Sequence, residues 1–166
     1  DDNASTSYIV EAIDYATNNG AKVINLSLGT NVYDAPLRAA IGRARAANVL
    51  VVAASGNCAL NDQLICNALA APGRMTWPAL YPEVLAVGAT TSNGQRASFS
   101  SYGNELDIVA PGQSIGPLPV FMSSGALNFY ATADGTSFSS PLVAGLASLI
   151  IAEKPDISID DLEFTI

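Results

Sequence analysis

The sequence has 166 residues, of which 49% are hydrophobic and 13% charged. This length and composition fit one compact domain of α/β or mixed type and exclude a disordered tail or a fibre. Fifteen acidic against seven basic residues give a formal net charge of −8. Such a surface repels nucleic-acid phosphates and anionic lipid headgroups, so we expect no nucleic-acid or membrane partner. The longest apolar stretch, residues 142–152, falls short of the roughly 20 residues that span a bilayer, which predicts no transmembrane helix.

Histidine is absent from the sequence, and there are only two cysteines. A histidine general base, a complete Ser-His-Asp triad or His-ligated zinc would therefore have to use residues outside these 166. Cys58 and Cys66 are too few for a four-ligand metal site. They are either two free thiols or a disulfide that closes a short loop, and the disulfide favours an oxidising, extracellular setting. Because the chain starts at Asp1 with no initiator Met or leader, we expect a processed or excised piece.

The first third of the chain alternates between helical and strand patterns. Apolar residues at helical spacing predict a helix over residues 9–16. Short β-branched runs at residues 23–29 and 49–54 predict strands that are buried on both faces of a sheet. Between these strands, Asp34 is expected to cap a second helix that ends at Asn48.

The remaining chain continues the alternation with two less regular excursions. We expect an irregular segment over residues 58–78, strands at 84–89 and 106–110, a loop or short hairpin over 113–133, a helix over 137–153 and a last short helix capped by Ser158. Strand, helix, strand in this order predicts right-handed crossovers and an α/β fold with a parallel sheet and helices on both faces. The loops that follow the strands then share one edge, where Gly29 and Asn57 should be neighbours.

Ser137 stands between a glycine turn and the start of an apolar helix. A hydroxyl there faces unpaired backbone N–H groups and the positive end of the helix dipole, which favour negative charge that develops during a reaction. Thr136, Ser137, Ser139 and Ser140 are also all good N-cap residues, and most serines at helix starts only cap. A nucleophile and a cap are both open interpretations of this pattern.

Asn57 follows a buried strand and Gly56, so its carboxamide is expected at the ligand edge of the sheet. A side-chain N–H at that place can donate to an oxyanion. The alternative is an asparagine in a left-handed turn. The sequence has no G-x-G-x-x-G, no G-K-[ST] and no carboxylates at calcium-loop spacing, so a doubly wound nucleotide-binding domain would lack its phosphate loop.

Six sequence blocks carry a resemblance to one family. They are VINLSLG at 23–29, VVAASGN at 51–57, YPEVLAVGA at 81–89, ASFSSYG at 97–103, DIVAPG at 107–112 and GTSFSSPLVAG at 135–145. In this order and spacing they resemble the C-terminal half of the catalytic domain of subtilisin-like serine proteases, the subtilases. The resemblance covers almost the whole chain and implies that residues 1–166 are the C-terminal portion of one such domain, with a subtilisin-like fold.

The resemblance also implies roles for particular residues. Ser137 would be the nucleophile that forms the acyl-enzyme, and Asn57 with the Ser137 backbone N–H would form the oxyanion hole. The substrate-binding residues would be Ser27, Leu28 and Gly29 as the edge that pairs with an extended substrate, Ala54, Ser55 and Gly56 as one pocket wall, and Thr76 near the pocket bottom. Many relatives have glycine at this last position, so the pocket is expected to be smaller and more polar.

Taken together, the resemblance predicts a secreted serine endopeptidase that acts on peptides or proteins. Its triad Asp and His would lie in N-terminal segments outside this chain, so the isolated chain should be nearly inactive. The missing N-terminal part, or a second copy, would cover an exposed apolar edge. No cofactor or metal is required for the chemistry, although subtilases often bind structural calcium. The alternative is a catalytically inactive subtilase-like module that acts in binding or assembly.

Overall fold

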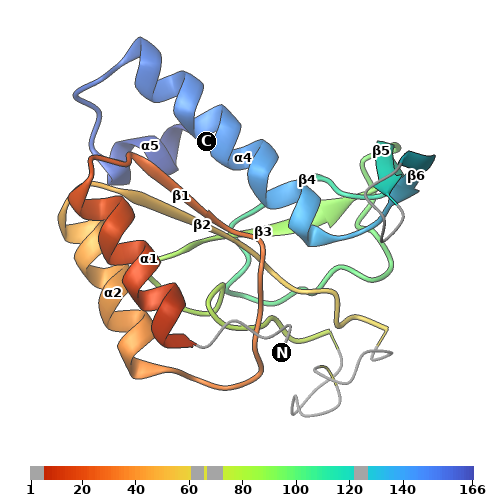
Figure 1. Ribbon diagram of the computed structural model, residues 1–166, viewed down its shortest axis with the longest axis horizontal. Helices are drawn as coiled ribbons and strands as arrows, with labels where there is room; N and C mark the ends of the chain where they lie inside the picture. The colour runs from red at the N-terminus through yellow and green to blue at the C-terminus, as the bar shows by residue number, and fades with distance from the viewer. Residues whose placement is uncertain (1–5, 61–65, 67–72, 122–126) are drawn as a thin grey trace.

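A four-stranded parallel sheet forms the centre of the computed structural model, which describes residues 6–60, 66, 73–121 and 127–166 (Figure 1). Its strands are β1 (Val23–Leu26), β2 (Leu50–Ala54), β3 (Leu85–Thr90) and β4 (Ile108–Pro111), in the order β1-β2-β3-β4. All three neighbouring pairs are parallel. This arrangement confirms the predicted α/β architecture, and all four predicted strands are present with boundaries shifted by one to three residues.

Helices cover both faces of this sheet, as predicted (Figure 1). Helices α1 (Thr6–Asn18) and α2 (Ala35–Ala46) lie on one face, while α4 (Thr136–Glu153) and α5 (Ile159–Thr165) lie on the other. Successive side chains of a strand point to opposite faces, so β2 contributes to two cores. Val51 and Ala53 pack with α1 and α2, whereas Leu50 and Val52 pack with α4 and α5.

Helix α4 is longer than the apolar stretch visible in the sequence. Its 18 residues are long and apolar enough to cross a membrane by length and composition alone, whereas the sequence-based expectation considered only the shorter apolar stretch 142–152. Its inner side chains Val143, Ala144 and Ala147 are buried against the sheet, and the helix contacts all four strands. Packing on the sheet therefore accounts for these three residues, while Leu142, Leu146 and Leu149 of the same helix are exposed.

The predicted helix ends are confirmed by their hydrogen bonds. Asp34 Oδ1 accepts from the Leu37 N–H at 2.8 Å, and Ser158 Oγ accepts from the Asp161 N–H at 3.1 Å. Asn48, which follows α2, adopts a φ of 59°, a left-handed conformation that Asn tolerates better than most residues.

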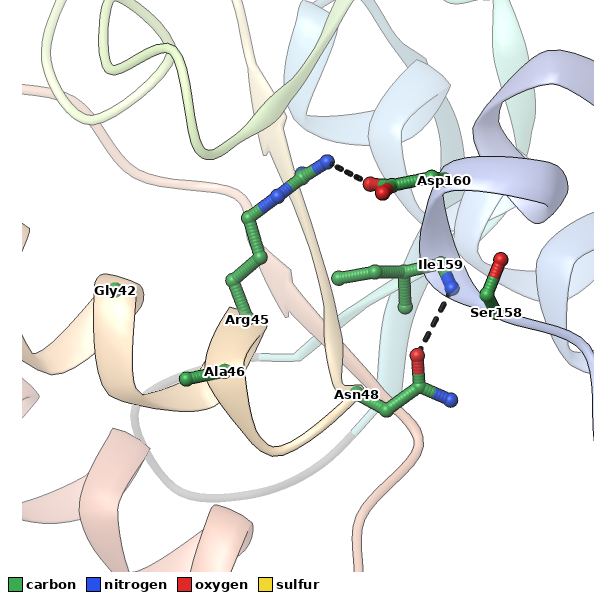
Figure 2. A pocket seen from close by; sticks show the side chains of 7 residues that line it. All are labelled: Gly42, Arg45, Ala46, Asn48, Ser158, Ile159 and Asp160. Carbon is green, nitrogen blue, oxygen red and sulfur yellow. Dashed lines mark hydrogen bonds and ion pairs between the residues drawn. The ribbon is translucent and has the colours of Figure 1, made fainter.

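A hollow of about 400 Å³ lies between the end of α2 and the start of α5 (Figure 2). Asn48 Oδ1 accepts from the Ile159 N–H at 2.9 Å, and Arg45 pairs with Asp160 at 2.6 Å between nitrogen and oxygen. Arg45 also pairs with Glu163 at 2.7 Å. These contacts hold α5 against α2. Each of them joins residues that are more than 100 positions apart in the sequence.

Two further segments lie at the carboxyl ends of the sheet strands. Strands β5 (Ile115–Phe121) and β6 (Leu127–Ala133) form an antiparallel hairpin that runs into α4, so the hairpin option is confirmed. Most of the irregular segment 58–78 lies outside the described residues. Near its end, Trp77 exchanges two backbone hydrogen bonds with Thr30, at 2.8 and 2.9 Å, and this pairing brings Thr76 close to the carboxyl ends of β1 and β2.

Candidate active site

A cavity of about 190 Å³ lies where the carboxyl ends of β1 and β2 meet the start of α4. It is lined by Ser27, Leu28, Gly29, Ala54, Gly56, Asn57, Cys58, Thr76, Thr136 and Ser137. The predicted proximity of Gly29 and Asn57 is therefore confirmed, because parallel strands end at the same edge of the sheet. The structure brings together all the site residues proposed from the sequence except Ser55.

Ser55 does not line the cavity. Its side chain is fully buried, and its hydroxyl donates to the Ser101 carbonyl at 3.3 Å. Alternation along the extended chain turns this side chain into the interior, while its neighbours Ala54 and Gly56 border the cavity. The Ser55 side chain therefore does not contribute to the cavity surface, and a part for its backbone in the pocket wall stays a prediction.

The orientation of the Asn57 carboxamide follows from its hydrogen bonds. Its Oδ1 accepts from the Thr136 N–H and from Thr136 Oγ1, both at 3.0 Å. The same Thr136 hydroxyl oxygen accepts from the Gly56 N–H at 3.2 Å. Because these donors identify the oxygen, the other end of the carboxamide is the NH₂ group, which makes no hydrogen bond to a described residue.

Asn57 does not adopt the left-handed turn conformation that the sequence left open as an alternative. Among the described residues, the non-glycine residues with positive φ are Asn48 and Ser114. Gly56 takes the left-handed conformation instead, with a φ of 109°, and glycine adopts it without steric cost. Asn57 is therefore placed by its contact with Thr136 and by the end of β2.

Ser137 is the second residue of α4 and is half-buried. The N-cap of this helix is Gly135, which supplies no side-chain hydrogen bond, so none of the neighbouring hydroxyls acts as a cap. Toward the described residues, neither the Ser137 hydroxyl nor its backbone N–H makes a hydrogen bond. The first N–H groups of a helix have no intrahelical acceptor. This N–H and the free NH₂ of Asn57 are thus two donors at one cavity, beside an unbonded hydroxyl.

Thr76 fills the space between the two walls of the cavity. Its side chain is buried, and Oγ1 lies 3.5 Å from the Ser55 carbonyl oxygen. A Cβ on Gly29 would lie 2.5 Å from Thr76 Oγ1, and one on Gly56 would lie 3.0 Å from it. Gly29 consequently needs to stay glycine as long as Thr76 is present, whereas Gly56 is also required by its φ of 109°. Thr76 thus keeps the cavity small.

Sequence reasoning gave no site role to two of the lining residues, Thr136 and Cys58. The contact of Thr136 with Asn57 joins positions 79 residues apart, which no local pattern reveals. Cys58 forms a disulfide with Cys66, and its N–H donates to Ser101 Oγ at 3.0 Å. The place of Cys58 directly after Asn57 in the sequence could have indicated that it lies at the site. Its disulfide anchors the chain just beyond Asn57.

None of the described residues that line the cavity has a charged side chain. The carboxyl groups with shifted pKa values lie elsewhere. Burial raises the pKa of Asp107, which stands before β4, and Arg38 lowers the pKa of Glu83 on the other side of the sheet. Within the described ranges, no group of three His, Cys, Asp or Glu side chains is placed to hold a metal ion.

Known proteins are similar to this chain over nearly its whole length. The family model described as "Subtilase family" matches residues 1–166. Subtilisin DY of Bacillus licheniformis is 41% identical over 152 residues, which cover 92% of this chain and 50% of the relative. Subtilisin Savinase of Lederbergia lenta is 42% identical over 154 residues, which cover 93% of this chain and 51% of the relative.

A solved structure, that of a cold-adapted subtilisin-like serine proteinase, matches with a TM-score of 0.76 and 31% identity. The match covers 97% of this chain and 53% of that one. The chain therefore spans about half the length of these similar proteins. Both comparisons give proteins that are named as subtilisins or subtilisin-like proteinases.

Proposed function

The chain belongs to the subtilase family, and we propose on that basis that it supplies the nucleophile, the oxyanion hole and part of the substrate cleft of a serine endopeptidase. Its sequence contains no histidine, so the triad His and Asp would come from outside these 166 residues. The observation that carries the proposal is the Ser137 hydroxyl beside two N–H donors in one cavity, with none of the three groups hydrogen-bonded to a residue in the described part of the chain. That arrangement suits acyl transfer.

In the proposed reaction the Ser137 oxygen attacks the carbonyl carbon of a peptide bond, and the external His takes the hydroxyl proton. The carbonyl oxygen becomes an oxyanion and accepts from the Ser137 N–H and from Asn57. The C–N bond then breaks, and the amine leaves with the proton that His returns. Water then takes the place of the amine and attacks the acyl carbon while His accepts its proton. The bond to the Ser137 oxygen breaks, and His returns the proton to that oxygen.

The edge next to the cavity suits an extended peptide substrate. The backbone groups of Leu28 and Gly29 make no hydrogen bond to another described segment, so they are available to pair with an added strand. The side chain that precedes the cleaved bond would enter the cavity above Thr76. Because Thr76 occupies the space between the walls, we expect small side chains there, such as those of Gly, Ala and Ser.

The other half of the catalytic domain is the partner that we propose for the exposed apolar surfaces of this chain. On α4, Leu142, Leu146 and Leu149 are 51%, 43% and 71% exposed. On the opposite face, a hollow of about 380 Å³ beside α1 and β1 is lined almost entirely by apolar side chains. Strand β1 is the sheet edge between these two surfaces. Because the relatives are about twice as long as this chain, their additional half is the occupant we expect.

Replacement of Leu149 by Glu should weaken the association of this chain with the other half when the two are produced as separate polypeptides. A buried leucine contributes about 1.5–3 kcal/mol, so we expect affinity to fall at least about tenfold. Titration of one half with the other, followed by fluorescence anisotropy, measures the change. Val109→Glu is the matched control, since Val109 is 46% exposed on β4 at the far sheet edge. Equal losses in both variants, or tight self-association of this chain in place of the mixed complex, would contradict the proposed partner.

We also propose that the protein works outside the cell. The Cys58–Cys66 disulfide supports this location, because cytosolic proteins usually keep their thiols reduced. Free thiols at these two positions in protein taken from its native compartment would contradict it.

A fluorophosphonate probe tests the catalytic proposal, because it labels only activated serines. In a protein that carries both halves, we expect labelling at Ser137 and complete loss of labelling in Ser137→Ala. Ser148→Ala is the matched control, since that hydroxyl donates to the Ala144 carbonyl at 2.8 Å farther along the same helix. An absence of labelling under conditions that label an active subtilisin would favour the inactive binding or assembly module.

A further inference from the structure

The carbonyl group of Ser137 lacks the donor that an α-helix would normally provide. In a helix the N–H of residue i+4 donates to the carbonyl of residue i. Four residues after Ser137 stands Pro141, inside α4, and proline has no N–H and crowds the carbonyl four residues before it. The Ser137 carbonyl therefore needs a donor from elsewhere in the molecule.

Ser27 provides that donor from the end of β1. Its hydroxyl donates to the Ser137 carbonyl at 2.9 Å, across 110 residues of sequence. The Ser27 oxygen in turn accepts from Asn25 Nδ2 at 2.9 Å, and Asn25 Oδ1 accepts from the Ser140 hydroxyl at 2.6 Å. All three bonds run in the same direction, from Ser140 through Asn25 and Ser27 to Ser137. Because the Asn25 N–H occupies a lone pair of the Ser27 oxygen, the Ser27 proton is directed toward the carbonyl, and such chains strengthen their members.

We propose that the Ser27 hydroxyl is a positioning residue for the nucleophile, an inference that rests on the proposed function. The backbone before and after the Ser137 side chain is held from two different strand ends. Asn57 holds the Thr136 N–H on one side, and Ser27 holds the Ser137 carbonyl on the other. Together they set the backbone of Ser137, and with it the direction of its hydroxyl. This role of the Ser27 side chain is separate from substrate pairing, which uses backbone groups of residues 27–29.

The experiment uses a protein that carries both halves, with Ser27→Ala, Ser27→Thr and Ser148→Ala compared on a peptide ester. Misplacement of a reacting group by about 1 Å can cost up to about 100-fold in rate. For Ser27→Ala, where one hydrogen bond is lost, we expect kcat to fall about tenfold with KM changed less than about twofold. Ser27→Thr keeps the hydroxyl and should retain most of kcat. Ser148→Ala should match the unaltered protein.

Pro141→Ala makes the test specific to the carbonyl contact. Alanine at 141 restores an N–H four residues after Ser137, so the carbonyl regains an intrahelical donor and no longer depends on Ser27. We expect Ser27→Ala to cost less than about twofold in the Pro141→Ala background, against about tenfold in the original one, and such a difference measures coupling. An equal cost in both backgrounds, or an unchanged kcat in Ser27→Ala, would overturn the assignment.

A measurement without catalysis separates this inference from the proposed function. The carbonyl ¹³C signal of Ser137 moves upfield when a hydrogen bond to it is lost. It should move in Ser27→Ala and stay in place in Ser148→Ala. If the unaltered protein is inert but the signal responds in this way, the proposed function fails and the contact between Ser27 and Ser137 stands. If the signal does not respond, the inference about Ser27 fails whatever the activity.

Discussion

Asn57→Ala and Asn57→Asp should each lower kcat for peptide hydrolysis by about 10²–10³-fold, with a much smaller change in KM. The magnitude is that established for removal of one oxyanion donor in a subtilisin, a member of the same family, and corresponds to about 2.7–4 kcal/mol. The physical reason is that the Asn57 NH₂ group makes no hydrogen bond to a described residue and is available where the oxyanion forms. A donor of this kind acts mainly in the transition state, so kcat carries the loss.

The Asn57→Asp variant separates donation from structural support. Its carboxylate would keep an oxygen that accepts from the Thr136 N–H, as Oδ1 of Asn57 does at 3.0 Å in the structure, but it would offer no N–H to the oxyanion. If Asn57 only held the start of α4, Asn57→Asp would retain most of kcat, and that outcome would contradict the oxyanion role. Steady-state kinetics on a peptide ester, with thermal unfolding of each variant, makes the distinction. Asn93→Ala, in an exposed turn, is the control for an asparagine away from the cavity.

Thr76→Gly should change the preferred side chain before the cleaved bond from small to large. The substitution removes the group that lies between Gly29 and Gly56 and opens the cavity floor. One methylene in a hydrophobic pocket changes discrimination by about 10–200-fold. We expect kcat/KM for a substrate with Phe at this position, relative to one with Ala, to rise about 10- to 100-fold. Competition between the two substrates in one reaction measures the ratio directly.

Two controls show whether volume is the cause. Thr76→Val keeps the volume of the side chain and removes only the hydroxyl, so the preference for small side chains should persist. Gly29→Ala should disrupt the unaltered protein, because the new Cβ would lie 2.5 Å from Thr76 Oγ1, and should be tolerated in the Thr76→Gly background. A rise in the Phe-to-Ala ratio for Thr76→Val as large as that for Thr76→Gly would show that the hydroxyl, and not the volume, sets the preference.

Much of the fold could be predicted because its signals are local. The continuous apolar run at residues 49–54 is typical of a strand that is buried on both faces, which made β2 predictable. The helix starts at Asp34 and Ser158 could be predicted because a cap and its N–H partner lie three residues apart. The shared edge of Gly29 and Asn57 followed from the parallel direction of strands that are joined through a helix. The family resemblance added the roles of Ser137 and Asn57, which local patterns alone left open between a functional and a structural interpretation.

What only the tertiary structure decided were contacts between segments far apart in the chain. It turned Ser55 into the interior, oriented the carboxamide of Asn57 through Thr136, and placed Thr76 between two glycines. It also joined Ser27 to the Ser137 carbonyl, which Pro141 leaves without an intrahelical donor. Spacing within one element reports which face of that element is buried. The partner that meets a given polar atom depends on how whole elements pack, and no pattern within either segment contains that information.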